Sequence, residues 1–450
     1  MCNIKMPDRA EKIISTLLDN GFDAYIVGGC VRDSLLGIQP NDWDICTSAK
    51  PEEVKSCFAG NRIIETGLKH GTVTVVIGDD QYEVTTFRVD GDYSDCRRPD
   101  SVEFVGDIRE DLARRDFTMN AMAYNGRDGL VDPFGGVESL HKRLVSCVGD
   151  PNDRFNEDAL RILRALRFSS VFGFQIEDKT SDAIHKNAGL LNNISAERIN
   201  VELCKLLSGK DVLRVLLNYP DVISTIIPEL KPCVGFEQHN KYHQYTVYDH
   251  IAHAVANYRG IDIMVRVALL LHDIGKPLCY TEDENGGHFY GHDIPSSELA
   301  AQVLSRLRFD NESQRIITEL VRYHDTAIEP TRRSVRRMLN KLGIDQFFRF
   351  MAVRLADIQA HTEGTQELRI INHNATLSLA WDIIRRNQCF TMKDLAVNGD
   401  DVMAFGIPEG KLVGKILKAA LNAVIDGELP NDRAALLSFI RIEVSEWSKL

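Results

Sequence analysis

Two aspartates two residues apart, Asp42 and Asp44, are the first side chains in this sequence that could do chemistry. The sequence predicts a β-strand beginning at Asp42, and residues i and i+2 of a strand point to the same face. Two carboxylates on one face repel each other, and a divalent cation that prefers hard oxygen ligands, such as Mg²⁺, relieves that repulsion. The alternative is an exposed strand edge, which we would favour if these aspartates stood alone.

A third carboxylate, Glu83, lies in another predicted strand at residues 82–87. Alternation places Glu83, Thr85 and Phe87 on one face of that strand. If this strand neighbours the one that carries the two aspartates, Glu83 would complete a site for two metal ions, an arrangement used for phosphoryl transfer. The alternative is an ordinary glutamate on the outer face of a strand.

The pair Gly28-Gly29 follows a short apolar strand at 24–27 and precedes a helix that carries Arg32. Glycines at such a turn let backbone amides approach phosphate oxygens, and the N-terminus of a helix favours anions. A glycine pair is common in turns that bind nothing, so it supports a phosphate site only together with the neighbouring carboxylates.

A predicted helix at 157–172 carries Asp158, Arg161, Arg164 and Arg167 at every third position. Residues three apart are neighbours on a helix surface, so these side chains form a row of fixed donors and acceptors. The row could bind a polar ligand, or it could be a solvated face crossed by salt bridges.

Histidines gather in the middle of the chain, where eight of the 13 fall between residues 239 and 324. An adjacent His-Asp pair, framed by histidines on both sides and a distant aspartate, has the composition of a site for one or two metal ions that activate water against phosphate esters. A lone histidine is more often a packed or surface residue, but six suitable residues follow in order: His250, His272, Asp273, His292, His324 and Asp357.

The segment 331–341 (TRRSVRRMLNK) carries five cations and no acid. A basic helical face is the footprint expected for an RNA backbone, and the alternative is a surface helix with extended side chains. The candidate RNA-binding residues are Arg332, Arg333, Arg336 and Arg337.

The elements that must position these groups change in type near residue 150. The first 150 residues mix strands and short helices, enough for one sheet, and almost every later segment has helical periodicity. We therefore expect a multidomain α+β protein whose mixed-sheet head precedes an all-α remainder. The predicted domains are a head at 1–150, a helical neck at 151–235, a histidine-rich domain at 236–365 and a helical tail at 366–450.

Composition sets further limits. The 450 residues are 44% apolar and carry a formal net charge of −12, which argues against a histone-like or basic-tail binder of polyanions. Ten scattered cysteines without a C-x-x-C pair indicate a reduced, cytoplasmic protein, and zinc ribbons are not expected. The first residues lack the apolar core of a signal peptide, and no apolar run approaches the ~18 residues that span a bilayer.

Several of these segments, in order, resemble the class II tRNA nucleotidyltransferases, the CCA-adding enzymes that share a polymerase-β-like head with bacterial poly(A) polymerases. The resemblance rests on IVGGCVRDSLLG (26–37), DWDICT (42–47), DYSDCRRP (92–99), RRDFTMNAM (114–122), DPFGG (132–136), RFNEDALRILRALRF (154–168) and ISAERI (194–199). Segments 395–402 and 429–433 resemble the C-terminal, tRNA-elbow-binding part of bacterial members.

The resemblance implies template-independent addition of C, C and A to the 3′ end of tRNA from CTP and ATP, with release of pyrophosphate. Asp42 and Asp44 would hold two Mg²⁺ ions, and Glu83 would be a third ligand. Asp158 and Arg161 would read the Watson–Crick edge of the incoming base, because cytosine and adenine both offer an exocyclic amine and a ring acceptor. The other nucleotide contacts implied are Gly29, Arg32, Arg115, Arg164 and Arg167.

The histidine-rich domain resembles the HD superfamily of metal-dependent phosphohydrolases. That resemblance implies a possible second divalent metal, bound by the six residues named above, and a cyclic phosphate or phosphomonoester at an RNA end as a substrate class. It leaves open whether this domain is catalytic or a structural insert.

Rival functions remain at this point. A bacterial poly(A) polymerase has the same head, although its basic tail is missing here. An A-adding specialist would keep the 92–99 loop, and an HD phosphohydrolase with a vestigial head is a rival of a different class. No membrane association and no obligate protein partner are expected.

Overall fold

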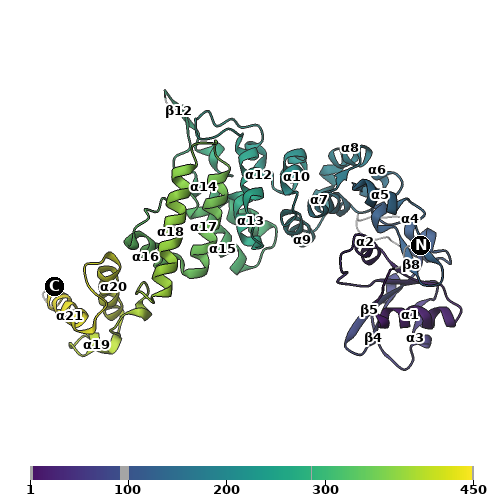
Figure 1. The fold of residues 1–450 in the computed structure, drawn as a ribbon, viewed down its shortest axis with the longest axis horizontal. Helices are drawn as coiled ribbons and strands as arrows, with labels where there is room; N and C mark the ends of the chain where they lie inside the picture. The colour runs from purple at the N-terminus through teal and green to yellow at the C-terminus, as the bar shows by residue number, and fades with distance from the viewer. Residues whose placement is uncertain (1–3, 92–100, 285, 448–450) are drawn as a thin grey trace. The chain divides into compact units, whose positions relative to one another are not determined.

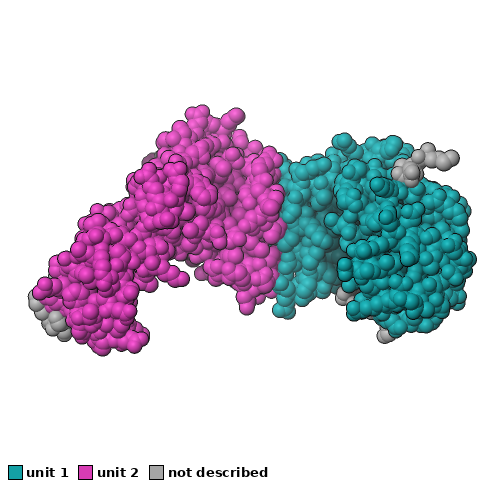
Figure 2. Space-filling model, turned by 60° about the horizontal axis from the view of Figure 1, so that its bottom comes forward, with its two compact units in different colours: residues 1–231, 306–308 teal, residues 232–305, 309–450 magenta. Residues whose placement is uncertain are grey.

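The computed structural model describes residues 4–91, 101–284 and 286–447, and it divides into two compact units (Figure 2). Unit 1 comprises residues 1–231 and 306–308, and unit 2 comprises residues 232–305 and 309–450. The four domains predicted from the sequence subdivide the chain more finely, and their boundaries stay predictions. The 92–99 loop lies outside the described residues.

Unit 1 begins with a mixed sheet of seven strands in the order β3-β4-β5-β2-β1-β8-β9. The central strand β1 is buried at all four positions and pairs antiparallel with β2 and β8, while β2 pairs parallel with β5. The strands are β1 (Ala24–Val27), β2 (Ile45–Thr47), β3 (Arg62–Gly67), β4 (Thr72–Ile77), β5 (Asp80–Thr86), β8 (Ala123–Asn125) and β9 (Gly129–Val131).

The helices of the head cover this sheet. The first helix buries residues 10, 13, 14 and 17, the spacing of a single apolar stripe, and it packs on β1. Figure 1 shows this helix beside α3, which it also contacts. The helices are α1 (Asp8–Asp19), α2 (Gly29–Leu35), α3 (Pro51–Cys57), α4 (Ile108–Ala113) and α5 (Gly136–Lys142), with 3₁₀ turns η1 (Leu68–His70) and η2 (Thr118–Asn120).

The rest of unit 1 is helical, and its centre is the pair α7 and α9, which pack against each other. The elements are α6 (Pro151–Glu157), α7 (Leu160–Phe172), α8 (Asp178–Asn187), η3 (Ala188–Asn193), α9 (Ala196–Leu207), α10 (Val212–Asn218) and α11 (Pro220–Ile226). Two-stranded pairs flank them: β6 (Arg88–Asp90) with β7 (Val102–Phe104), and β10 (Leu144–Val145) with β11 (Gln175–Ile176). The turn η4 (Pro228–Cys233) follows.

Unit 2 is built from helices, with one short hairpin of β12 (Thr281–Asp283) and β13 (Gly286–His288). Its histidine-rich part is a bundle in which α13 packs on α12, α15 and α17. The elements are α12 (Val247–Asn257), α13 (Ile263–Leu271), η5 (Lys276–Leu278), α14 (Asp293–Arg306), α15 (Asn311–Tyr323), α16 (Arg332–Leu342), α17 (Ile344–Gln359), α18 (Glu367–Arg385), η6 (Met392–Asp394), α19 (Gly399–Met403), α20 (Lys411–Asp426) and α21 (Arg433–Trp447).

The expected fold class, a mixed-sheet head followed by helices, is confirmed. Two local predictions were wrong. Asp42 and Asp44 lie in the segment before β2, which begins only at Ile45. The helix expected over 157–172 begins three residues later, as α7 at Leu160, because Asp158 has extended backbone and its side chain accepts a hydrogen bond from the Leu160 amide. Among the described residues, no helix is long and apolar enough to cross a membrane.

Candidate functional site

The three carboxylates predicted to act together line one cavity of about 840 Å³ in the head. Asp42 and Asp44 reach it from the segment before β2, and Glu83 reaches it from β5. The sheet register explains the meeting, because Ile45 of β2 pairs with Val84 of the parallel β5, so the residues before them are also neighbours. Desolvation and the neighbouring charge of Asp42 raise the pKa of Asp44, and Arg115 opposes this rise. Carboxylates are the ligands that a hard divalent cation prefers, and three of them line this cavity.

The glycine turn brings cations beside these carboxylates. Gly28 has φ +75°, and a Cβ there would lie 2.8 Å from Nη1 of Arg115, so both the turn and the approach of Arg115 require glycine. Arg32, one turn into α2, donates from Nη1 to Oδ1 of Asn120 at 2.6 Å. At Gly29 a Cβ would meet only ordinary contacts. The turn therefore lets Arg115 approach Asp44, whose pKa it lowers, while Arg32 is held by Asn120.

Three of the candidate arginines surround one aromatic ring. The guanidinium carbons of Arg32, Arg164 and Arg167 lie 5.1, 5.5 and 4.1 Å from the ring centroid of Phe168. Arg32 belongs to α2 and the others to α7, so the ring joins the phosphate turn of the head to the arginine row. Cation–π contacts of this kind help to hold the guanidinium groups in place, in addition to their hydrogen bonds and ion pairs with Asn120, Asp116 and Glu202. The sequence analysis did not single out Phe168.

A second residue missed from the sequence, Asp116, organises the same region. Its Oδ2 accepts from Nε and Nη2 of Arg164 at 2.8 and 2.6 Å, and its Oδ1 accepts from Nδ2 of Asn120 at 3.0 Å. Burial alone would raise the pKa of Asp116, but Arg164 and Asn120 hold it at about 2. Because Asn120 also accepts from Arg32, a buried chain of hydrogen bonds connects α2 to α7. The sequence did point to this residue, because Asp116 directly follows Arg114 and Arg115 in the RRDFTMN segment.

The predicted base-reading pair lies at the junction of α6 and α7. Oδ2 of Asp158 accepts from Nη2 of Arg198 on α9 at 2.8 Å. Nη1 of Arg161 donates to Oε2 of Glu157 at 2.6 Å, and its Nη2 donates to the carbonyl of Arg114 at 3.0 Å. Both side chains are thus oriented by fixed partners. Arg167, the last of the row, pairs with Glu202 at 3.1 Å.

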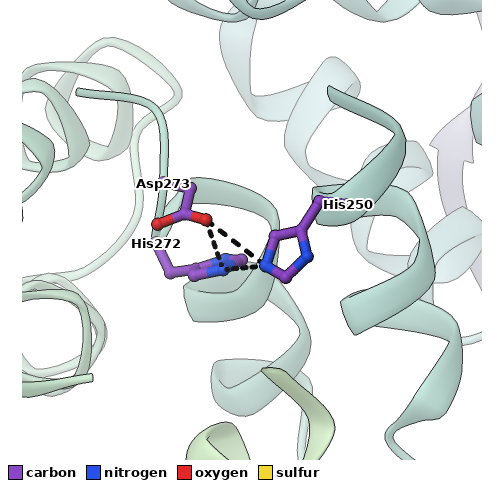
Figure 3. Close-up of side chains that lie close together, drawn as sticks. All are labelled: His250, His272 and Asp273. Carbon is purple, nitrogen blue, oxygen red and sulfur yellow. Dashed lines mark hydrogen bonds and ion pairs between the residues drawn. The ribbon is translucent and has the colours of Figure 1, made fainter. Parts of the chain in front are cut away.

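Unit 2 brings together all six residues of the predicted histidine site. Figure 3 shows His250 and His272 converging on Asp273 from α12 and the end of α13. His292, His324 and Asp357 join them, and the six side chains are 0–7% exposed. Ligand atoms lie within 4.8 Å of one another in three overlapping groups, one of which adds His361 to His250 and Asp357.

The histidine tautomers are fixed by the backbone. Nδ1 of His272, His292 and His324 lies 2.7–2.8 Å from the carbonyl three residues earlier in each case. A carbonyl only accepts, so Nδ1 carries a proton and Nε2 is the ring atom left to face a ligand. All three Nε2 atoms, and that of His250, face Asp273. Such backbone hydrogen bonds behind an imidazole are typical of metal ligands.

Asp273 divides the four imidazoles into two pairs. Its Oδ2 lies 3.4 and 3.1 Å from Nε2 of His250 and His272, and its Oδ1 lies 3.1 and 3.4 Å from Nε2 of His292 and His324. Burial alone would raise the pKa of Asp273, but His272 and the buried Lys276, 2.7 Å away, hold it well below its ordinary value. The donor set of imidazoles and carboxylates fits transition-metal ions.

The predicted RNA-binding arginines lie on α16 and have partners within unit 2. Arg332 pairs with Asp382 at 2.5 Å, and Arg333 and Arg337 pair with Asp426 at 3.0 and 2.7 Å. These three side chains remain 41–56% exposed. Nη1 of Arg336 instead donates to the carbonyl of Val424, which turns this guanidinium toward the protein.

Comparison with family models matches three stretches of the chain. Residues 24–146 match the poly A polymerase head domain, and residues 173–232 match the probable RNA and SrmB-binding site of polymerase A. Residues 294–440 match a putative tRNA nucleotidyltransferase domain 2.

Full-length relatives and solved structures agree with these matches. A CCA-adding enzyme of Lactobacillus delbrueckii subsp. bulgaricus is 34% identical over 98% of this chain and 100% of its own length. That of Geobacillus stearothermophilus is 36% identical over 95% of each chain. The crystal structure of the Bacillus stearothermophilus CCA-adding enzyme in complex with CTP has a TM-score of 0.73 at 32% identity, covering 99% of each chain. The Thermotoga maritima CCA-adding enzyme complexed with tRNA shares the fold, with a TM-score of 0.65 at 21% identity over 98% of this chain and 97% of its own.

A poly(A) polymerase would share the head with this chain. The CCA-adding enzymes are instead a third or more identical to it over nearly its whole length. The similarity extends over both units of the chain. The chain belongs to the family of CCA-adding enzymes.

Proposed function

We propose that this protein adds C, C and A to the 3′ end of tRNA from CTP and ATP, without a nucleic-acid template and with release of pyrophosphate. The observation that carries the proposal is the cavity shared by Asp42, Asp44 and Glu83, in a chain related over its full length to CCA-adding enzymes. The substrate of this reaction is tRNA, and we expect the protein to act in the cytoplasm.

Asp42 and Asp44 are the proposed ligands of two Mg²⁺ ions, and Glu83 is the proposed third ligand. When bound, the ions would lower the pKa of the attacking 3′-hydroxyl and neutralise charge on the transferred and leaving phosphates. Arg115, whose charge acts on Asp44, and Arg32, on the helix after the glycine turn, are the proposed source of fixed positive charge for the triphosphate. Gly29, on the same turn, lets the backbone approach the phosphates closely.

Asp158 and Arg161 are the proposed readers of the incoming base. A carboxylate accepts from the exocyclic amine that cytosine and adenine share, and a guanidinium donates to the ring nitrogen. Guanine and uracil would turn an acceptor toward the carboxylate and a donor toward the guanidinium, and such mismatched pairs cost binding energy. Arg198 and Glu157 hold the two readers in place, while Arg164 and Arg167 border the nucleotide.

The arginine row of α16 is proposed to contact tRNA phosphates through Arg332, Arg333 and Arg337, whose side chains are half exposed. Arg336 was included in the same prediction, and its proposed role is to hold α16 on α20 through the carbonyl of Val424. Recognition would depend on the shape and backbone of tRNA more than on its sequence.

The decisive experiment incubates the full chain with tRNA lacking CCA, Mg²⁺, and CTP and ATP singly and together. Ordered addition of two C residues and one A supports the proposal. Addition of A only, to tRNA that ends in CC, would identify an A-adding specialist. Long A tails on unrelated RNA would identify a poly(A) polymerase.

The buried cluster in unit 2 favours a second function, metal-dependent hydrolysis of a phosphate ester. We propose that His250, His272, Asp273, His292, His324 and Asp357 bind one or two divalent ions there. The supporting observation is the set of backbone-fixed Nε2 atoms that face Asp273. The ions would activate water when bound. The cluster opens into a cavity of about 650 Å³, lined also by Lys276, which could receive the phosphate.

This second function is tested with Ni²⁺, Co²⁺ or Mn²⁺ and a panel of phosphomonoesters and cyclic phosphates, including an RNA with a 2′,3′-cyclic phosphate end. Release of phosphate or opening of the ring supports it. If no metal binds at this cluster, the residues form a structural core.

A further inference from the structure

A groove of about 750 Å³ lies along α18 in unit 2, away from the histidine cluster, and we call it the Trp381 groove. It is lined by the tryptophan, by Arg332 of α16 and by Asp382, Arg385 and Arg386 near the end of α18. None of the functions proposed so far uses this aromatic side chain, which is 59% exposed.

The indole of Trp381 is held in place although it is exposed. Its ring lies on Phe348 of α17, with ring centroids 4.5 Å apart and an interplanar angle of 32°. An offset contact of this kind orients the indole and leaves a large aromatic surface in water. A large exposed aromatic surface usually marks a binding site, and nucleobases stack on such surfaces without regard to sequence.

The charge around the indole is positive. Asp382 accepts from Arg332 at 2.5 Å and from Arg386 at 2.6 Å, and Arg385 lies 3.7 Å from it. One carboxylate cannot neutralise three guanidinium groups, so the lining carries a net charge of +2. Arg385 and Arg386 are 80% and 62% exposed, so their donors are accessible to a phosphate.

The positive surface continues onto α16, which packs on α18. Arg333 and Arg337 share one partner, Asp426, and are 54% and 56% exposed. A row of arginines beside a fixed indole combines the two elements of single-strand RNA binding, phosphate attraction and base stacking.

We propose that the Trp381 groove binds the tRNA substrate, with an unpaired base stacked on Trp381 and adjacent phosphates on Arg385 and Arg386. This inference rests on the proposed CCA-adding function. RNA is favoured over a second copy of the chain, because a two-fold contact would bring the same surplus of arginines together. It is favoured over a protein partner because the surplus of arginines, which share the groove with Trp381, Leu379 and Ile384, is best neutralised by a polyanion.

The test compares W381A, W381F and I371A in the full chain. Ile371 is a matched control, because it is 62% exposed on the same helix but lies outside the groove. We expect W381A to raise the KM for tRNA on the order of 10-fold, as loss of one stacked base does. W381F should restore most of that loss, and I371A should change nothing. The kcat and the KM for CTP should stay constant in all three.

Salt dependence provides a second measurement. R385A should reduce the slope of log binding constant against log salt by roughly 0.7–0.9, the value for one phosphate contact. An unchanged KM for tRNA in W381A, or an unchanged slope in R385A, overturns the proposal. A dimer that W381A dissociates in sedimentation would assign the groove to self-association instead.

Filter binding of tRNA separates this proposal from the function on which it rests. If the wild-type chain binds tRNA but adds no nucleotide, the proposed reaction fails and the groove is still tested by the affinity of W381A. If wild type adds CCA and W381A binds tRNA equally well, only the groove assignment fails.

Discussion

Arg164 donates two hydrogen bonds, from Nε and Nη2, to a single carboxylate oxygen of Asp116, at 2.8 and 2.6 Å. The two residues are 48 positions apart, one in the head and one on α7. Through Asn120 the same carboxylate is connected to Arg32 at the glycine turn. The proposed phosphate site and the proposed base-reading helix are therefore parts of one buried polar network.

We expect D116N to destabilise the protein by about 3 kcal/mol, because it leaves the guanidinium of Arg164 without its buried counter-charge. The loss is measured as the change in the free energy of unfolding of the full chain in urea, taken from the first unfolding transition. The double variant D116N/R164M should be less destabilised than the sum of the two single variants, because the second change removes the unpaired charge. Additive losses would show that the two side chains do not interact.

The stabilising effect of Asp116 should depend on pH in a defined direction. Its pKa is about 2 in the folded chain against an ordinary value of 3.8. Because its pKa is lower in the folded chain, Asp116 stabilises the fold at any pH above its unfolded pKa, by about 2 kcal/mol. This stabilisation is lost as the pH falls from the unfolded pKa to below the folded pKa. The difference in unfolding free energy between wild type and D116N should be constant from about pH 8 to 5 and shrink below about pH 4. A difference that grows toward acid pH would contradict this.

Removing one carboxylate of the proposed metal site should abolish nucleotide addition. We expect D42A to lower kcat for CTP addition by on the order of 10²–10³-fold or more, because the transition-state charge loses its stabilisation. D79N is the matched control, since Asp79 lines the same cavity from the turn between β4 and β5. D79N should retain near-normal rates, and equal losses in both variants would show that the cavity charge as a whole matters, not this ligand.

Removing the guanidinium of Arg161 should relax base choice. We expect R161A to lower the preference for CTP over UTP by on the order of 10- to 100-fold, the worth of hydrogen bonds to a charged group. The rate with CTP should fall as well. Single-nucleotide addition with each of the four triphosphates measures both effects. If R161A kept its base selectivity and only its rate fell, Arg161 would have a structural role, through its hydrogen bonds to Glu157 and to the carbonyl of Arg114.

Metal binding in unit 2 should be separable from nucleotide addition. Full-length H324A should bind Mn²⁺ or Ni²⁺ more than about 100-fold more weakly at this cluster, because ligands contribute more than their outer-shell partners. H253A is the matched control, since His253 lies on α12 with His250 but stacks on Tyr245. Both variants should add CTP normally with Mg²⁺. Equal metal content in wild type and H324A would remove the second proposed function.

The sequence by itself determined the order of the elements and most of their bounds. Strand β1 begins and ends where the sequence predicts, because apolar spacing within one segment is set by local backbone geometry. The candidate carboxylates and histidines could be named from residue type, spacing and the family resemblance together.

Only the tertiary structure decided which groups meet. Asp116 with Arg164, Asp158 with Arg198, and the division of four imidazoles between the two oxygens of Asp273 depend on residues far apart in the chain. The sequence also could not place Asp42 and Asp44 ahead of β2, because strand bounds depend on pairing with β1 and β5. Partner choice follows from burial, where an ionised group without a partner costs several kcal/mol, and burial is a property of the folded chain.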